Sequence, residues 1–271
     1  MLGRALTPPP LPSPGEEAAE RLQAVTVLNP EGTSPYVLLC EHASRHIPAR
    51  YAGLGLPEAD QSAHIAWDIG AKMMALAMAE ALDAPLVMAG FSRLLIDLNR
   101  PLQSRSSIPV VSETTPIRGN ENLTEAERDY RVRTYFQPFQ EAVGALLDRR
   151  REKGVPTAVI GVHSFTPVFK GFSRPWASGV LCSHSLAFGQ ALVAALDRPD
   201  APSAVNEPYV IETEEDYTVP VHGEARGLTA VLIEIRQDLI ANREGALEWA
   251  GHCVRALRAC QSLVVPPAGG A

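Results

Sequence analysis

The chain has 271 residues, of which 46% are hydrophobic and 20% are charged, and its formal net charge is −7. The length suits one large α/β domain, and the composition is typical of a globular protein with a sizeable core. The negative charge argues against a nucleic-acid partner, because a phosphate-binding face needs clustered Lys and Arg. No apolar run reaches the ~18–20 residues that cross a bilayer, so no membrane partner is expected either.

Four cysteines are scattered along the chain without a CxxC pair, at Cys40, Cys182, Cys253 and Cys260. In a chain of this length they are predicted to be reduced, buried thiols and not a disulfide framework. The N-terminal segment lacks the apolar region of a secretory signal peptide. These features predict a cytoplasmic location.

The first 22 residues are rich in proline and predict a flexible arm, whereas residues 23–265 predict a single domain. Along that domain, apolar runs typical of strands alternate with segments of helical periodicity. In chain order these are a strand at 36–40, a helix at 64–82, strands at 85–89 and 94–98, a helix at 124–153, strands at 157–162 and 179–182, a helix at 185–196, a strand at 229–235 and a helix at 238–262. The polar stretches 99–122 and 206–227 carry no predicted element. The alternation predicts an α/β fold, a three-layer α/β/α sandwich around a mixed, mostly parallel central sheet.

Polar residues stand at or near the ends of three predicted strands, where packing would not select them. They are Glu41-His42, His163-Ser164 and Glu234. Active sites of open α/β sheets gather at the carboxyl ends of the strands. Two histidines and a carboxylate delivered there suit a zinc site with an open position for water. Three separately satisfied polar groups would give the same pattern, and the sequence leaves both interpretations open.

A second polar group surrounds Asp97, a charged residue that follows an apolar run. Charge in such a run is unfavourable unless it is paired. Arg93 and Arg100 flank it and could clamp a substrate carboxylate in bidentate fashion. A structural Arg–Asp pair is the alternative for each arginine.

The other histidines are weaker candidates. His222 lies in an irregular stretch, where functional groups concentrate. His46, His64, His184 and His252 give no comparable signal. The chain has no Gly-rich phosphate loop and no GxSxG nucleophile elbow.

Several of these segments together resemble the N-formylglutamate amidohydrolase family. The matching segments are residues 40–44, 67–71, 92–101, 162–165 and 232–238, in this order and with suitable spacing. The resemblance implies a fold like that of the zinc carboxypeptidases and aspartoacylases, with one catalytic zinc ion. Glu41 and Ser44 flank His42 where family members that act on N-formylglutamate carry other residues, so the chain resembles a divergent branch.

The resemblance also implies roles for individual residues. His42 and His163 match the two histidine ligands of the metal. The carboxypeptidase-like pattern has Glu three positions after the first His, where this chain has Arg45. Asp68 is therefore the predicted third ligand, with Glu41 as the alternative.

The remaining roles concern catalysis and substrate binding. The resemblance implies Glu234 as the general base, with Arg100 and His222 as further catalytic candidates. It implies that the substrate is held by Arg93, Asn99, Arg100 and Ser164.

The implied activity is metal-dependent removal of an N-formyl or N-acyl group from an amino acid by zinc-activated water, with the small N-acyl amino acid as partner. A zinc carboxypeptidase that cleaves peptides is one alternative. A non-catalytic carboxylate-binding protein on the same fold is another. A serine hydrolase that uses Ser44 or Ser164 is a third, although it lacks the elbow motif. The sequence does not predict an oligomeric state.

Overall fold

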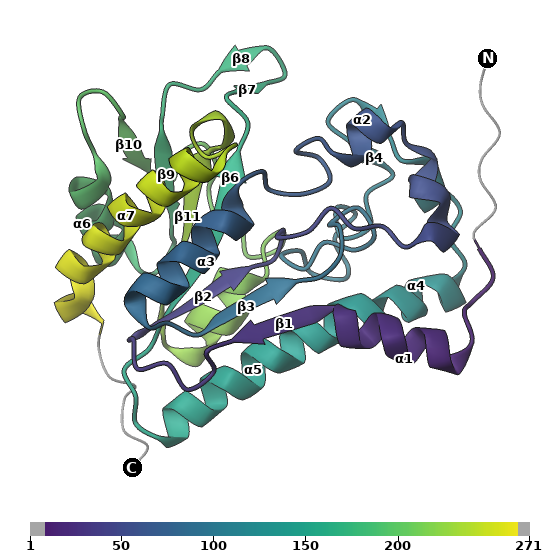
Figure 1. Cartoon of the computed structure of the whole chain (residues 1–271), viewed down its shortest axis with the longest axis horizontal. Helices are drawn as coiled ribbons and strands as arrows, with labels where there is room; N and C mark the ends of the chain where they lie inside the picture. Colours follow the sequence, from purple (N-terminus) through teal and green to yellow (C-terminus); the bar gives the residue numbers. More distant parts are fainter. Residues whose placement is uncertain (1–8, 265–271) are drawn as a thin grey trace.

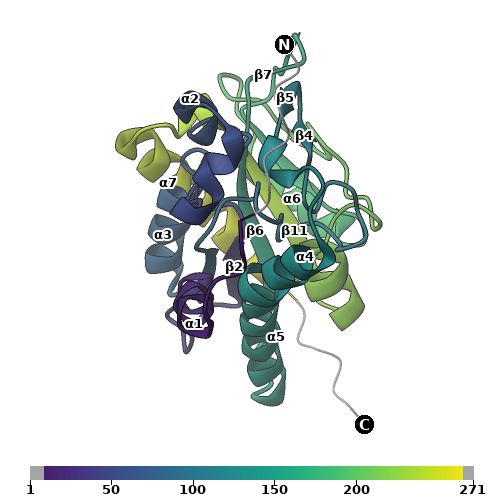
Figure 2. The same cartoon turned by 90° about the vertical axis from the view of Figure 1, so that its right-hand side faces the viewer.

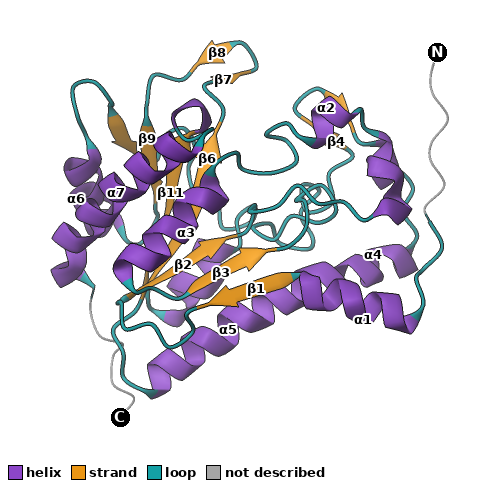
Figure 3. Cartoon of the chain, in the orientation of Figure 1, coloured by secondary structure: helices purple, strands orange, loops and turns teal. Residues whose placement is uncertain are grey.

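A seven-stranded mixed sheet forms the centre of the chain in the computed structural model, which describes residues 9–264 (Figures 1 and 3). Its strands are β1 (Val25–Leu28), β2 (Tyr36–Cys40), β3 (Leu86–Ala89), β6 (Ala158–Phe165), β9 (Ser178–Leu181), β10 (Ser203–Val205) and β11 (Thr229–Arg236). They lie in the order β1-β3-β2-β6-β11-β9-β10. The neighbours β3, β2, β6 and β11 run parallel, so their carboxyl ends meet at one edge of the sheet. Strands β1 and β9 pair antiparallel with β3 and β11, and β10 is parallel to β9, so the predicted mixed, mostly parallel sheet is confirmed.

Alternate residues of the central strands face opposite helical layers. On β2, Leu38 and Cys40 pack into one apolar cluster, whereas Val37 and Leu39 pack into another. The first cluster includes α3 (Ala71–Leu82), α6 (Leu186–Leu196) and α7 (Arg243–Cys260), and the second includes α4 (Glu125–Arg131) and α5 (Gln137–Glu152). Figure 2 shows α3 and α7 on one side of the sheet and α4 and α5 on the other. The three-layer sandwich is therefore confirmed, and burial on both faces explains the continuously apolar strands.

The N-terminal segment contains a helix where we expected a flexible arm. Helix α1 (Pro14–Gln23) begins with a capping box between Ser13 and Glu16. Its Glu20 accepts a 2.8 Å hydrogen bond from the Tyr130 hydroxyl, which ties the helix to α4. Residues 14–22 are thus ordered against the domain. Residues 1–8 of the expected arm and residue 265 of the expected domain lie outside the described residues.

The predicted strand at 94–98 is wrong, because this apolar segment forms turns and pairs with no strand. Its apolar side chains are buried, but side chains from elsewhere satisfy its carbonyl groups. The Asn120 amide donates to the carbonyl of Leu94 at 2.8 Å, and Arg131 donates to that of Leu95 at 2.9 Å. A buried apolar run alone does not distinguish this arrangement from a strand. The short edge strands β1 and β10 were not predicted.

The predicted helices differ from the structure mainly where they begin. Helix α3 starts at Ala71, because Gly70 has a positive φ of 83° and residues 64–70 form turns. A Cβ at Gly70 would lie 2.1 Å from the backbone oxygen of Ile240. Between α4 and α5, residues 132–136 form a π-helix just before Pro138, which lacks an N–H to donate.

Short elements lie outside the main sheet. They are helix α2 (Glu58–Gln61) and the hairpins β4 (Val111–Ser112) with β5 (Thr115–Pro116) and β7 (Val168–Phe169) with β8 (Phe172–Ser173). The β7–β8 hairpin follows the carboxyl end of β6 and stands beyond it in Figure 1. Within residues 9–264, no helix combines the length and the apolarity that a bilayer crossing requires.

Candidate functional site

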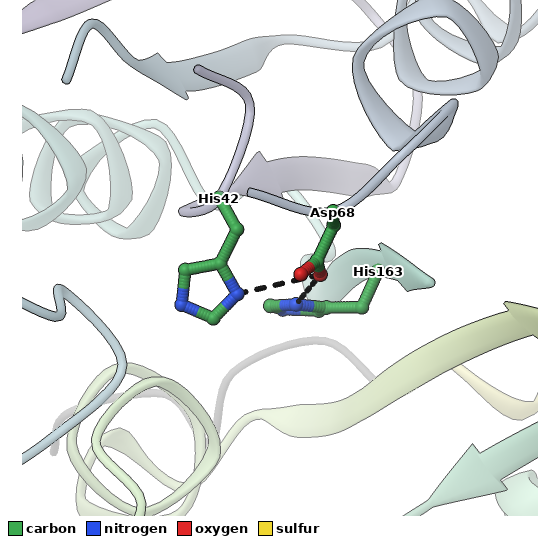
Figure 4. Close-up of side chains that lie close together, drawn as sticks. All are labelled: His42, Asp68 and His163. Atoms are coloured by element: carbon green, nitrogen blue, oxygen red, sulfur yellow. Dashed lines mark hydrogen bonds and ion pairs between the residues drawn. The ribbon is translucent and has the colours of Figure 1, made fainter. Parts of the chain in front are cut away.

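Two histidines and an aspartate converge at the carboxyl edge of the parallel strands (Figure 4). His42 lies two residues beyond β2, His163 lies on β6, and Asp68 lies in the turns before α3. The Nδ1 atoms of His42 and His163 are 3.3 Å and 2.9 Å from Oδ2 of Asp68. One potential ligand atom from each residue lies within 4.8 Å of the others, and the three residues are only 2–4% exposed. The structure therefore brings together the three residues expected to bind a metal.

A second carboxylate stands behind each imidazole. The Nε2 atom of His42 lies 2.8 Å from Oδ1 of Asp97, and that of His163 lies 3.1 Å from Oε2 of Glu41. A carboxylate at Nε2 favours a hydrogen on that nitrogen, so that Nδ1 of the neutral imidazole would offer its lone pair to a metal ion. Glu41, the alternative third ligand, thus contacts the far side of His163.

Opposite charges determine the protonation of the group. Burial disfavours the charged form of His163, but the carboxylates of Glu41 and Asp68 outweigh burial and hold its pKa well above the usual value. Burial likewise disfavours the charged form of Asp68, but His42 and His163 outweigh it and lower its pKa. The group therefore carries positive charge between carboxylates, the position that a cation would take.

Glu234 differs from the other two predicted catalytic residues, Arg100 and His222, because its buried side chain forms no hydrogen bond or ion pair with residues 9–264. It lies on β11 directly opposite His163 in the parallel register. Ile233 and Ile235 pack into the apolar cluster that includes α3, α6 and α7, so Glu234 faces the other side of the sheet, as His163 does. Its Oε2 atom has no hydrogen-bond partner within residues 9–264. Burial raises the pKa of Glu234 to about 7, against the opposing positive charge of His163, and such a carboxylate can accept a proton near neutrality.

Both arginines expected to clamp a substrate have protein partners. Arg93 donates from Nε to Oδ2 of Asp97 at 2.9 Å, and its Nη1 lies 3.5 Å from Oδ1 of Asp68. Arg100 donates from Nη1 to the backbone carbonyl of Glu215 at 2.6 Å and to Oδ1 of Asp216 at 3.2 Å. The structural pairing that the sequence left open is therefore present, although the two arginine side chains keep 25% and 27% of their surface exposed.

Two of the expected substrate-binding residues, Asn99 and Ser164, form hydrogen bonds with the backbone. Asn99 accepts through Oδ1 from the N–H of Thr218 at 2.8 Å. Ser164 donates from Oγ to the carbonyl of Ile69 at 2.8 Å, and its N–H donates to Oδ2 of Asp68 at 3.2 Å. Both residues thus position the turns around the site.

His222 does not join the two histidines at the carboxyl edge. Its Nε2 donates to Oε1 of Gln140 at 2.6 Å. Burial lowers the pKa of His222 to about 4, which keeps the ring neutral. The other histidines have partners elsewhere, namely Phe91 for His46, Glu113 for His64, Glu224 for His184 and Glu248 for His252.

Sequence reasoning missed three residues of this region. Glu41 was considered only as a metal ligand, although its place just before His42 also allows an orienting role. Arg174 and Tyr209 were not considered, because one follows a short hairpin and the other lies in the polar stretch 206–227. The guanidinium Cζ of Arg174 lies 4.6 Å from the ring centre of Tyr209. A contact between residues so far apart along the chain leaves no local sequence signal.

The chain is similar to a protein family and to solved structures. A family model described as N-formylglutamate amidohydrolase matches residues 34–241. The crystal structure of gene product Atu2144 from Agrobacterium tumefaciens is 38% identical, with a TM-score of 0.85, and the match covers 89% of this chain and 96% of that one. The N-formylglutamate amidohydrolase from Ralstonia eutropha JMP134 is 17% identical, with a TM-score of 0.60 and coverage of 89% and 98%, and shares the fold. No curated protein sequence gives a match.

The matched range contains each of the four residues that meet at the carboxyl edge of the sheet, which are His42, Asp68, His163 and Glu234. It also spans most of the chain. By the extent of this match, the chain belongs to the N-formylglutamate amidohydrolase family.

Proposed function

We propose that this protein is a metal-dependent amidohydrolase that removes an N-formyl or other N-acyl group from an amino acid, with one zinc ion held by His42, Asp68 and His163. The observation that carries the proposal is the convergence of these three donors, with a carboxylate behind each imidazole. Two His and one carboxylate form a common donor set of catalytic zinc sites and leave a coordination position open. Carboxylates that orient ligand imidazoles are a recurrent feature of such sites.

The residues present fit the ion in charge as well as in geometry. The cluster holds positive charge that a divalent cation would replace, and Oε2 of Glu234 faces the same side of the sheet without a partner among the described residues. A zinc ion bound there would lower the pKa of a coordinated water to about 7 and withdraw charge from the substrate carbonyl.

The protein groups around the donors have separate tasks in this proposal. Glu234 accepts the proton of the attacking water on its carboxylate, holds it, and delivers it to the amine nitrogen of the leaving amino acid. Asp97 and Glu41 keep the imidazoles of His42 and His163 turned toward Asp68. Arg93, 3.5 Å from Asp68, places positive charge next to the position where the carbonyl oxygen becomes negative.

Burial favours this activity over the alternatives. Because the three donors are at most 4% exposed, a small N-acyl amino acid suits the site better than a peptide chain, which would need an open cleft. A buried carboxylate oxygen without a partner, such as Oε2 of Glu234, is destabilising. A non-catalytic protein that binds carboxylates has no use for a further negative charge in its site. The serine hydrolase alternative needs an imidazole hydrogen-bonded to Ser44 or Ser164. In the structure, Ser44 Oγ accepts from the backbone N–H of His46, and Ser164 Oγ donates to the backbone carbonyl of Ile69.

Metal removal and restoration test the function directly. The zinc-loaded protein should hydrolyse at least one member of a panel of N-formyl and N-acetyl amino acids, and chelation should abolish the activity. Readdition of zinc should restore it, and released amine gives the readout. Activity that survives complete chelation, or cleavage of C-terminal residues from peptides instead, would count against the proposal.

The carboxylates behind the imidazoles should affect metal affinity. Asp97→Asn and Glu41→Gln keep the shape of the side chain but weaken its hold on the imidazole of His42 or His163. Each should lower zinc affinity by about 10–100-fold. Competition with a chromophoric chelator measures this. The matched control is Asp238→Asn, at an exposed carboxylate that pairs with Arg236, and its zinc affinity should equal that of the unsubstituted protein.

A further inference from the structure

Arg174 is a buried guanidinium with no carboxylate partner among residues 9–264. It is 6% exposed, and its side-chain hydrogen bond runs from Nη1 to the backbone carbonyl of Thr166 at 3.2 Å. Among the other buried arginines, Arg131 pairs with Glu127, whereas Arg150 has no carboxylate partner in this range either but donates to several backbone carbonyls and to a hydroxyl. Burying a cation without a counter-ion is unfavourable. Within the described part of the chain, Arg174 has neither a carboxylate nor several such acceptors, so an anionic partner would stabilise it.

Three aromatic rings surround this guanidinium. Its Cζ atom lies 4.6 Å from the ring centre of Tyr209, 4.7 Å from that of Phe169 and 5.6 Å from that of Phe165. Contacts with aromatic faces partly offset the loss of hydration. They hold the planar group in place, and such a pre-organised fork of N–H donors matches a carboxylate in bidentate fashion.

The location of Arg174 relates it to the metal-binding residues. Phe165 follows His163 by two residues on β6, so the two side chains share a face and their Cα atoms are about 7 Å apart along the strand. The pKa of Tyr209 is raised by burial and by Glu234, and Arg174 and Arg93 oppose the change. The tyrosine thus lies within electrostatic range of the proposed base and of both guanidinium groups.

We propose that Arg174, positioned by Tyr209 and Phe169, binds a carboxylate of the substrate and so selects N-acyl amino acids that carry a carboxylate at that position. This inference rests on the proposed amidohydrolase function and adds the residue that selects the substrate. Arg93 and Arg100 are less suited to this task, because Asp97 and Asp216 already engage them. An N-acyl amino acid offers an α-carboxylate, and an acidic one offers a side-chain carboxylate as well.

The test combines substrate analogues with Arg174→Met, which keeps most of the apolar bulk of the side chain. The substrates are N-formylglutamate, its α-amide and N-formylglutamine, so that each analogue lacks one carboxylate. The unsubstituted enzyme should lose about 100-fold in kcat/KM on one analogue. Relative to the unsubstituted enzyme, Arg174→Met should lose a similar factor in kcat/KM on N-formylglutamate. On the analogue that the unsubstituted enzyme hydrolyses slowly, the substitution should cause little further loss. The carboxylate that this analogue lacks is then the one that Arg174 binds.

Two controls keep the result interpretable. Arg198→Met removes another guanidinium that stacks on an aromatic ring, 5.2 Å from the centre of Trp249, and should leave all three rates unchanged. Arg174→Lys retains the charge but not the bidentate fork, and should lie between Arg174→Met and the unsubstituted enzyme. It also replaces Arg174→Met if that variant does not fold.

Calorimetric binding of N-formylglutamate to zinc-loaded Glu234→Gln protein, with and without Arg174→Met, separates this inference from the proposed function. Binding that weakens at least 10-fold without Arg174 supports the carboxylate contact even if the unsubstituted protein hydrolyses nothing, in which case only the amidohydrolase proposal fails. Unchanged binding together with an unchanged preference among the three substrates overturns the inference. Absence of both binding and hydrolysis overturns both.

Discussion

Replacing Glu234 by Gln should lower kcat/KM for amide hydrolysis by about 10³-fold while the protein keeps its zinc ion. General acid–base groups contribute about 10²–10⁴-fold to such rates, and glutamine retains the shape of the side chain without its ability to take up a proton. Because Glu234 is not among the three converging donors, metal affinity should not change. Steady-state kinetics and metal analysis on the same preparation measure both effects.

The pH profile provides a check on the same residue. Activity of the unsubstituted enzyme should fall as the pH drops through the pKa of Glu234, because a protonated carboxyl cannot accept the proton of water. Burial, against the opposing positive charge of His163, raises this pKa to about 7, so the activity should fall near that pH. The acidic limb should be missing from the residual activity of Glu234→Gln. A variant with unimpaired turnover and an unchanged profile would remove Glu234 from the mechanism.

His163→Ala should abolish both zinc binding and hydrolysis. The substitution removes one of three ligands and also frees the carboxylates of Glu41 and Asp68, whose negative charges would then face each other with less compensation. We expect the purified variant to contain less than about a tenth of the zinc of the unsubstituted protein, since a site that loses a ligand binds far more weakly. Metal analysis after desalting, combined with activity, tests this.

The matched control for His163→Ala is His184→Ala. His184 has a largely exposed side chain and lies outside the converging group, so its replacement should leave zinc content and activity intact. A fully metallated, active His163→Ala protein would show that the imidazole is not a ligand. Loss of zinc in both variants would instead indicate a general effect of the substitutions on stability.

The positions of His42, His163 and Glu234 could be predicted because each interrupts or ends an apolar strand. An apolar strand selects hydrophobic residues on both faces, so a polar residue near its carboxyl end stands out in the sequence. The strands themselves were predictable for the same reason, and β2, β6 and β11 lie close to where the apolar runs placed them. Asp68 needed the family resemblance, because a carboxylate before a helix looks like an ordinary cap.

Sequence alone could not decide which charged groups pair. Whether Arg93 and Arg100 are free or engaged depends on Asp97 and Asp216, and the second of these lies more than a hundred residues from Arg100 along the chain. The same applies to Arg174, whose contact with Tyr209 joins two loops that the sequence does not relate. The prediction of a strand at 94–98 was wrong for the same reason. The side chains of Asn120 and Arg131, distant along the chain, form the hydrogen bonds that a neighbouring strand would otherwise provide.

The most direct test of the central claim is a crystal structure of the zinc-loaded protein with anomalous diffraction data collected on both sides of the zinc absorption edge. We expect one anomalous peak within about 2.0–2.2 Å of Nδ1 of His42, Nδ1 of His163 and an Asp68 oxygen, with Glu234 facing the open coordination position. Zinc bound elsewhere, or no peak at these three residues in a fully loaded, active crystal, would contradict the account.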